Sequence, residues 1–446
     1  MPSAIPQAPS PRERYPRQSL FIFRRDPLAF FLSLGKLGKL VRFRLLENED
    51  WYLVNDPDLI QRVFTSDNRH FVKGRTLSET KRILGEGLLT SEGELHHRQR
   101  RLIQPAFSHR KVEGYADAMV DVIESVERSW KPGEQRDIHR EMYALTLRVI
   151  GNALFSTDVG DRAVAVNDAL NNAIEMVGRL SLPYSNIWEH LPIPPLRRFK
   201  ANIRFLNETM RELVEDRRAR GEAPEDALSL LFDAQADGVT DLTDKQIRDE
   251  AMTMFLAGHE TTASTLSWIW YLLSEHPEVE ARLHEELDRV LGGRRPTLED
   301  IPELTVTEAI VAETVRLYPP VWNIGRVVIT DDYSLGGYPI RFNSVLSMSP
   351  WVTHHDPSWY PDPFRFDLSR WTPEERAKRP RYAYFPFGGG PRMCLGEGFS
   401  WLEARLSLAH IAQRWRLRHV AGHRAEPVPL VTLRPRYGMQ MTLESR

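Results

Sequence analysis

The chain has very little cysteine: Cys394 is the only one among 446 residues. A single cysteine cannot form an intramolecular disulfide, so nothing in the sequence calls for an oxidising compartment, and we expect a cytoplasmic protein. An excess of either charge is also missing, because 59 basic and 61 acidic residues nearly cancel. Binding to a phosphate backbone usually depends on a basic surface, so nucleic acid is not an expected partner.

Long apolar runs are absent as well. Prolines and arginines break residues 1–18, where a signal peptide or anchor would need unbroken apolar side chains. The apolar stretch at 20–34 contains two arginines and an aspartate, which are costly inside a bilayer. We therefore expect no membrane span, a flexible N-terminal tail over residues 1–20 and one large domain over residues 21–446.

Helical periodicity dominates residues 95–318 and predicts a mainly α fold with small β-sheets, an α+β class. A proline-rich break at 182–195 separates two helical blocks. Thr243 and Gln246 form a capping-box pattern, and the segment from there to Glu275 predicts one helix roughly 45–50 Å long. β-like runs predict a hairpin at 41–46 and 51–54 and further short strands at 326–330, 338–340 and 344–349.

The cysteine lies in a glycine-rich loop, Phe387-Gly-Gly-Gly-Pro-Arg-Met-Cys394-Leu-Gly396, directly before a run with helical character. At a helix N-terminus, the helix dipole and the free N–H groups favour a thiolate, the form that binds a metal ion. Glycines let the backbone lie against a flat ring, and Arg392 has the reach to pair with a cofactor carboxylate. A buried structural cysteine is the alternative that the loop alone leaves open. A phosphate-binding loop is excluded because the required Gly-Lys-Ser/Thr is missing.

At these residues the sequence resembles the cytochrome P-450 family, whose haem loop follows F-x-x-G-x-R-x-C-x-G. Every fixed position of that pattern is filled, by Phe387, Gly390, Arg392, Cys394 and Gly396. The resemblance extends from about residue 41 to the C-terminus and implies the P-450 fold, with a long central helix over haem b (iron protoporphyrin IX). It makes Cys394 the axial iron ligand, whose electron donation favours O–O cleavage, and adds Phe387, Gly388 and Arg392 as cofactor contacts.

Glu313 and Arg316 stand at i, i+3 in AIVAETVRLYPP, a segment that is apolar on nearly every side. A charged pair in such surroundings is expected to be buried and to need further partners. The resemblance identifies the family's E-x-x-R motif and matches the P-x-R-F segment to Pro363-Phe364-Arg365-Phe366. Arg365 is therefore the expected third member of a network that locks the haem-loop region.

The centre of the long helix carries a polar group, AGHETT at 257–262, amid apolar residues. Gly258 costs about 1 kcal/mol relative to alanine. The Thr261 hydroxyl can compete for the Ala257 carbonyl and open the helix locally. A polar kink without chemistry is the alternative from these residues alone, and a zinc-protease motif is excluded because its second histidine is missing. By resemblance, Glu260 and Thr261 are the family's proton-delivery pair.

Further cofactor contacts follow from the resemblance. His96 and Arg100, one helical turn apart in HHRQRR, match a propionate-binding H-x-x-x-R, and Arg326 matches a further propionate-binding arginine. Most charges of HHRQRR otherwise suit a surface helix. The cluster His354-His355-Asp356 looks like a metal site, but it lies in an irregular proline-rich stretch, and we interpret it as structural.

Substrate-facing positions can be inferred only by resemblance. They comprise the segment after Phe71, the region 176–188, and the residues Phe255, Ala257, Val321, Trp322, Ile324 and Leu433. These positions are largely apolar, so a pocket made from them would hold its ligand mainly by buried area. Fatty acids, terpenoids and similar lipophiles suit such a pocket.

These features together predict a haem-thiolate monooxygenase that inserts one oxygen atom of O2 into a lipophilic substrate. No flavin-binding or iron–sulfur domain accompanies it, so we expect an external ferredoxin- or flavodoxin-like donor and its reductase. Two alternatives keep the haem. One is a peroxygenase or isomerase, against which the acid–alcohol pair argues, and the other is a sensor or carrier without turnover.

Overall fold

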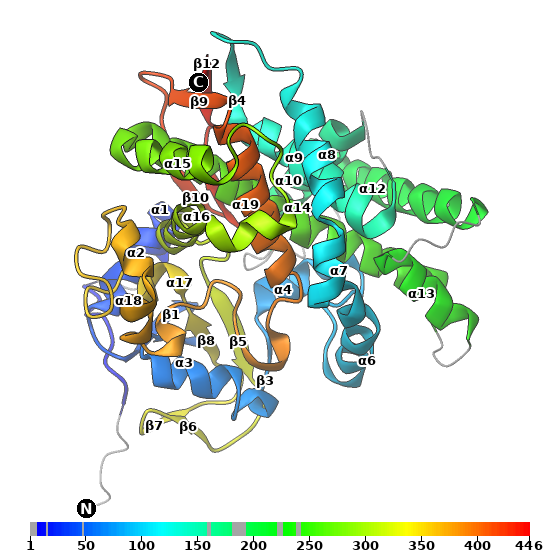
Figure 1. The fold of residues 1–446 in the computed structure, drawn as a ribbon. Helices are drawn as coiled ribbons and strands as arrows, with labels where there is room; N and C mark the ends of the chain where they lie inside the picture. The colour runs from blue at the N-terminus through cyan, green and yellow to red at the C-terminus, as the bar shows by residue number, and fades with distance from the viewer. Residues whose placement is uncertain are drawn as a thin grey trace, which may run out of the picture. The chain divides into compact units, whose positions relative to one another are not determined.

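The computed structural model describes residues 7–14, 17–46, 49–157, 162–180, 193–220, 226–237 and 242–446. The expected proline-rich break lies outside this part of the chain over residues 182–192. The fold is mainly helical with small sheets, which confirms the predicted class (Figure 1). The chain divides into two compact units. We call them the sheet unit, Met1–Arg75 with Ala312–Cys394, and the helical unit, Thr76–Val311 with Leu395–Arg446.

The sheet unit contains a five-stranded sheet in the order β1-β2-β8-β5-β3. Its strands are β1 Leu40–Leu46, β2 Glu49–Val54, β8 Val345–Met348, β5 Ile324–Val328 and β3 Phe71–Lys73. The predicted hairpin is present, with Leu40 opposite Val54, and only the β2–β8 pairing is parallel. A second small hairpin joins β6 Tyr333–Leu335 to β7 Tyr338–Ile340.

Short helices complete the sheet unit. They are α1 Gln18–Arg25, α2 Pro27–Gly35, α3 Pro57–Phe64, α17 Pro350–Thr353 and α18 Pro373–Ala377. The carboxylate of Asp56 caps α3 by accepting from the N–H groups of Asp58 and Leu59, and Pro57 supplies the fixed φ of the first helical position. The expected boundary between the N-terminal tail and the domain, at residue 20, stays a prediction. Two residues of the expected tail nevertheless contact the sheet unit: Ala8 is buried in its core, and the Pro9 carbonyl accepts a hydrogen bond from the Arg42 N–H.

The helical unit is built around α14, Asp244–Glu275. The capping box is formed as predicted: the Gln246 N–H donates to Thr243 Oγ1 at 3.2 Å, and the Thr243 N–H donates to Gln246 Oε1 at 2.9 Å. The helix ends before Pro277, where α15 Pro277–Val290 begins. Other helices of this unit are α5 Lys81–Leu84, α6 Gly93–Ile103, α7 His109–Gly114, α8 Ala116–Glu127, α9 Ile138–Phe155, α10 Arg162–Leu180, α12 Pro194–Ala219, α13 Ala227–Ala236 and α19 Glu397–Ala412. Two further helices, α4 Arg75–Glu79 and α16 Thr305–Leu317, include residues of both units.

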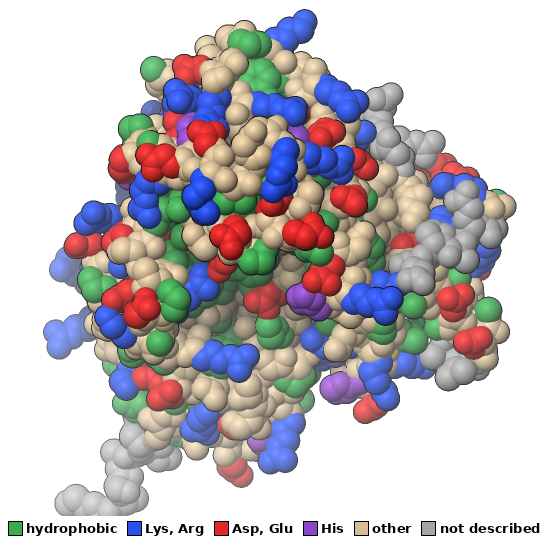
Figure 2. Space-filling view, viewed as in Figure 1, with side chains coloured by type: hydrophobic (Ala, Val, Ile, Leu, Met, Phe, Trp, Pro, Cys, Tyr) green, Lys and Arg blue, Asp and Glu red, His purple; other side chains and the backbone are tan. Residues whose placement is uncertain are grey.

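Two small sheets belong to the helical unit, and most of their strands come from its C-terminal part. One has the order β4-β12-β9, with β4 Gln135–Asp137, β12 Gln440–Ser445 and β9 Trp415–His419. The other pairs β10 Pro427–Pro429 with β11 Leu433–Pro435. Within the described residues, no helix is long and apolar enough to cross a membrane. Figure 2 shows basic and acidic side chains interspersed over the visible face, in keeping with the balanced composition.

Candidate functional site

The cysteine loop ends the sheet unit directly before α19. Cys394 lies three positions before Glu397, the first residue of that helix, and its side chain is exposed. Its backbone N–H donates to the Phe387 carbonyl at 3.0 Å, which closes the loop. An exposed thiol excludes the buried structural role that the sequence left open. A position near a helix start generally favours the thiolate, and this stays a prediction for Cys394.

The shape of this loop depends on glycine at two positions. Gly388 and Gly390 have φ values of 72° and 65°, in the left-handed region that L side chains rarely adopt. A Cβ atom on Gly390 would lie 1.8 Å from the carbonyl oxygen of Phe64, the last residue of α3. That contact is with backbone, so no side-chain rotation can relieve it. The loop is thus pressed directly against α3.

Glu313 and Arg316 form the buried pair that the sequence predicts. Both side chains are fully buried, and Arg316 donates to Glu313 through Nε and Nη2, each at 2.8 Å. The remaining guanidinium donors are satisfied by carbonyl oxygens of the stretch 354–365. Glu313 also accepts from the Trp371 indole at 2.9 Å and the Asp367 N–H at 3.0 Å. The charges are therefore matched and hydrogen-bonded, as burial requires.

The third charged member of this network is Arg370 and not the expected Arg365. Arg370 is 8% exposed, and its Nε lies 3.3 Å from Glu313 Oε1. Arg365 has an exposed side chain and contributes only its carbonyl, which accepts from Arg316 at 3.2 Å. The reason is a 3-10 turn over Leu368–Trp371, which aims both Arg370 and Trp371 at Glu313. The stretch 363–371 holds two Arg-aromatic dipeptides, Arg365-Phe366 and Arg370-Trp371, and composition alone does not distinguish them.

The two histidines of the cluster 354–356 lie in the interior of the sheet unit. His354 and His355 are buried, and His354 Nε2 accepts the Phe385 N–H at 3.1 Å. Burial lowers the pKa of His354 well below its usual value and lowers that of His355 to about 3. Both rings are therefore neutral packing groups. The part of the chain that the structure describes contains no group of three or more His, Cys, Asp or Glu side chains placed to hold a metal ion.

Two arginines expected at the cofactor lie in the sheet unit. Arg326, on β5, is 8% exposed, and its guanidinium stands over the Phe64 ring, 5.6 Å from the ring centroid. Phe64 therefore contacts both Arg326 and the cysteine loop. Arg392 is partly buried within the loop itself. Of the other expected contacts, His96 and Arg100 lie one turn apart on α6 in the helical unit, where His96 is 3% exposed. Their roles stay predictions.

The centre of α14 differs from expectation in one respect. The Thr261 hydroxyl donates to the Ala257 carbonyl at 2.9 Å, as predicted, but the helix continues unbroken from Asp244 to Glu275. The expected local opening is absent. Gly258 has another explanation, because a Cβ atom there would lie 2.4 Å from Ile150 Cδ1 of α9. Glycine permits the close approach of the two helices.

Glu260 is buried, with 2% of its surface exposed, and it accepts a hydrogen bond from the Thr432 hydroxyl at 2.5 Å. Burial raises the pKa of the Glu260 carboxyl, while this hydrogen bond and the charge of Arg434 oppose the rise. A carboxyl in this state exchanges protons more readily near neutral pH than an exposed one. Sequence reasoning missed Thr432, because only the fold brings residues 260 and 432 together.

The predicted substrate positions separate into two groups. Phe255 is 1% exposed and packs on Phe155 of α9 with ring centroids 4.6 Å apart, and Leu433 is fully buried. Trp322 is 9% exposed and packs edge-on against Phe31. These three pack in the protein interior, and their contact with substrate stays a prediction. Ala257 is exposed and Val321 and Ile324 are partly exposed, and of the region 176–188 only residues up to 180 are described.

The residues present fit a haem. A single exposed sulfur atom stands at a helix start, on a loop whose glycines exclude side chains from its surface. Arg326 and Arg392 supply guanidinium groups on the same unit as that sulfur atom, and guanidinium suits the two carboxylates of a haem. A thiolate ligand with charge-matching arginines is the donor set of an iron porphyrin and not of a bare metal ion.

Comparison with known proteins supports a haem protein with a thiolate ligand. The family model for cytochrome P-450 matches residues 22–441. Cyclooctatin synthase of Streptomyces melanosporofaciens is 40% identical over 416 residues, which cover 92% of this chain and 90% of the relative. Pentalenene oxygenase of Streptomyces avermitilis is 36% identical and covers 95% and 94%. The crystal structure of the cytochrome P450DA haem domain superposes with a TM-score of 0.87 at 27% identity, covering 99% of this chain and 98% of that one.

A helical fold with small sheets and a cysteine loop before a helix defines a haem-thiolate protein. The chain belongs to the cytochrome P-450 family and is a monooxygenase. Enzymes of this family use a haem, O2, a lipophilic substrate and redox partners.

Proposed function

We propose that this enzyme oxygenates a cyclic terpenoid, with haem b held by Cys394. The observation that carries the proposal is the exposed thiol at the start of α19, on a loop whose shape requires glycine at 390. The substrate class rests on relatives named cyclooctatin synthase, cyclooctat-9-en-7-ol 5-monooxygenase, which is 38% identical, and pentalenene oxygenase. Largely apolar positions such as Ala257, Val321 and Ile324 suit such a ligand.

The overall reaction joins one oxygen atom of O2 to the substrate and releases the other as water, which consumes two electrons and two protons. When bound, the haem supplies the activation of O2. The protein supplies the thiolate of Cys394, which donates electron density through the sulfur atom. Thr261 offers a hydroxyl on the accessible side of α14, and Glu260, the preceding residue, offers a buried carboxyl whose raised pKa favours its protonated form. Arg326, Arg392, Arg100 and His96 would neutralise the carboxylates of the cofactor.

Electrons would come from a ferredoxin- or flavodoxin-like donor with its reductase, and we place the enzyme in the cytoplasm. The donor follows from the redox partners that enzymes of this family use, and the compartment follows from the single cysteine, which calls for no oxidising environment.

Substrate titration and isotope labelling test the proposal together. Purified haem-loaded enzyme is titrated with cyclic diterpene and sesquiterpene hydrocarbons and, as a matched comparison, with fatty acids of similar carbon number. A terpenoid should shift the spin state of the haem and yield, with surrogate reductases and ¹⁸O2, a product that carries one ¹⁸O atom. Selective response to fatty acids would overturn the substrate class. Product labelled from H2¹⁸O, or formed without O2, would overturn the oxygenation.

A further inference from the structure

A line of polar side chains runs along one face of α19, a helix that is otherwise mostly apolar. Ser400, Glu403, Ser407, His410 and Arg414 follow one another at spacings of three or four residues, with Arg414 just beyond the helix end. Residues at such spacings share one face and have Cβ atoms about 5–6 Å apart. The line therefore extends over the whole length of the helix.

The middle of this line is deeply buried and poorly paired. Glu403 and Ser407 are 0% exposed and His410 is 1% exposed. Neither carboxylate oxygen of Glu403, nor Ser407 Oγ, nor either ring nitrogen of His410 has a well-formed hydrogen bond to any described residue. A polar group in a protein interior needs a hydrogen-bond partner, because burial removes its hydrogen bonds to bulk water. The side chains around Glu403, Ser407 and His410 do not saturate their polar atoms, and such a row of buried polar groups suits bridging by ordered water molecules.

The inner end of the line reaches the centre of α14. The Thr262 hydroxyl lies 3.1 Å from Ser400 Oγ. The same hydroxyl also faces the Glu403 carboxyl and opposes the rise in its pKa that burial causes. Thr262 directly follows Thr261, the residue assigned to oxygen activation. The line thus ends beside the proposed reaction centre of this unit.

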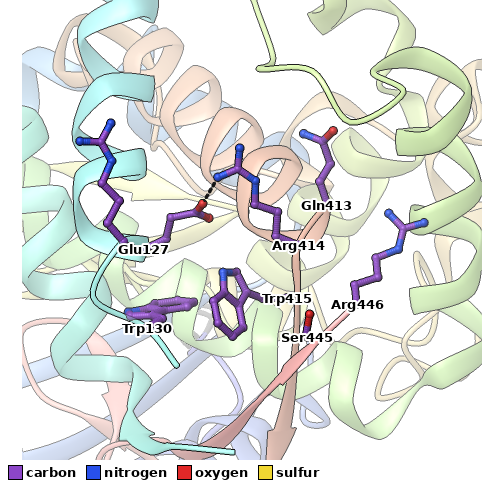
Figure 3. A pocket seen from close by; sticks show the side chains of 8 residues that line it. Glu127, Trp130, Gln413, Arg414, Trp415, Ser445 and Arg446 are labelled. Carbon is purple, nitrogen blue, oxygen red and sulfur yellow. Dashed lines mark hydrogen bonds and ion pairs between the residues drawn. The ribbon is translucent and has the colours of Figure 1, made fainter. Parts of the chain in front are cut away.

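The outer end reaches a surface pocket of about 490 Å³. His410 Nε2 lies 3.5 Å from Glu127 Oε1, and Glu127 is paired with Arg414. Glu127 is 5% exposed, and its second carboxylate oxygen has no hydrogen-bond partner in the described part of the chain. Figure 3 shows Glu127 and Arg414 pointing toward one another in the pocket, with Trp130 and Trp415 beside them.

We propose that Thr262, Ser400, Glu403, Ser407, His410 and Glu127, here called the polar file, form a second route by which protons pass from this pocket to the centre of α14. The proposal rests on the proposed function, because oxygenation consumes two protons per turnover. A proton supply through Glu260 alone would be limited, because its carboxyl is buried and accepts a hydrogen bond from Thr432. Carboxyl, imidazole and hydroxyl groups each accept and release a proton, and single water molecules bridge groups one helical turn apart.

The charge state of Glu403 suits the passage of protons. Burial raises the pKa of its carboxyl well above the usual value and so favours the protonated, neutral form. A neutral carboxylic acid gives up its proton toward Thr262 and regains one from the side of Ser407. No net charge is then stored in the helical core, where it would be costly.

Infrared spectroscopy of the resting haem-loaded enzyme tests the route without turnover. Glu403→Gln should remove one carbonyl band of a protonated carboxyl, which identifies Glu403. After transfer to D2O this band should shift rapidly in the wild type. It should shift at least about tenfold more slowly in Ser407→Ala and His410→Leu, since a positioned proton-transfer group contributes about 10²–10⁴-fold. Ser267→Ala is the matched control, because this serine is equally buried but bonds Ala263 and His139 away from the file.

Equal exchange in all variants, or no protonated carboxyl band lost in Glu403→Gln, would overturn the proposal. Turnover supplies the second measurement: Ser407→Ala and His410→Leu should lower product per electron pair and increase peroxide, whereas Ser267→Ala should not. Slow exchange in these two variants together with no product in the wild type would mean that the route exists and the proposed function is wrong. Fast exchange in these two variants together with normal product from the wild type would mean that the route does not exist and that the proposed function is correct.

Discussion

Replacing Arg370 should harm the enzyme far more than replacing Arg365. Arg370→Ala removes the ion pair to Glu313 at 3.3 Å and two hydrogen bonds to carbonyl oxygens, at 2.6 Å to Pro361 and 3.0 Å to Asp362. Hydrogen bonds that involve a charged group contribute about 1.5–3 kcal/mol, and we expect a loss in that range. Arg365→Ala keeps the carbonyl that accepts from Arg316 and removes only an exposed side chain, so the change should stay within about 0.5 kcal/mol.

Among these three variants, Glu313→Ala should lose the most stability. It leaves the Arg316 guanidinium fully buried without its carboxylate, and breaking a buried pair in this way costs about 3–5 kcal/mol. Arg316 keeps three carbonyl acceptors, which places the expected loss at the lower end of that range.

The assay is urea unfolding of haem-loaded protein, followed by the Soret absorbance, together with the yield of haem-loaded enzyme. The midpoints should fall in the order wild type and Arg365→Ala, then Arg370→Ala, then Glu313→Ala. A midpoint for Arg365→Ala as low as that of Arg370→Ala would refute the assignment of Arg370.

Four further outcomes are expected. Cys394→Ala should abolish the red-shifted Soret band of the reduced carbon monoxide complex, and a retained band would disprove thiolate ligation. Thr261→Ala should keep haem content and substrate binding but lower product per electron pair and raise peroxide; unchanged coupling would remove the proton-delivery role. Gly258→Ala should destabilise by about 1–3 kcal/mol, because overpacking against Ile150 exceeds the helical gain of about 1 kcal/mol, and Ile150→Val should restore part of the loss. Because the pKa of His355 is lowered to about 3, the free energy of unfolding should decrease as the pH falls from about 6.5, the usual histidine pKa, toward 3. His355→Phe should flatten that loss in urea midpoints measured across this range, and an unchanged pH dependence would contradict it.

Local signals in the sequence predicted the helices well. The capping box at Thr243 and the proline at 277 define the two ends of α14, because each acts on backbone groups within a few residues of itself. The hairpin at β1 and β2 and the helix start at Asp56 were predicted for the same reason. The burial of Glu313 with Arg316 followed from the apolar residues beside them in the chain.

Long-range contacts were the part that the sequence did not determine. Arg370 rather than Arg365 reaches Glu313 because a single 3-10 turn decides which arginine points inward. Thr432 is 172 positions from Glu260, and no local pattern connects them. Phe255 was expected at the substrate, but the apolar character that suggested this also fits the interface with α9, where the residue lies.

The contact between Gly390 and the Phe64 carbonyl bears on the order of events during synthesis. The sheet unit is assembled from Met1–Arg75 and Ala312–Cys394, so its two halves leave the ribosome separated by all of residues 76–311. The part of α3 that contacts the cysteine loop is synthesised early, but the loop itself emerges only after residues 76–311 have been synthesised. Capture of the cofactor through Cys394 therefore follows synthesis of most of the helical unit. Nascent chains halted before residue 394 should retain no haem through a thiolate.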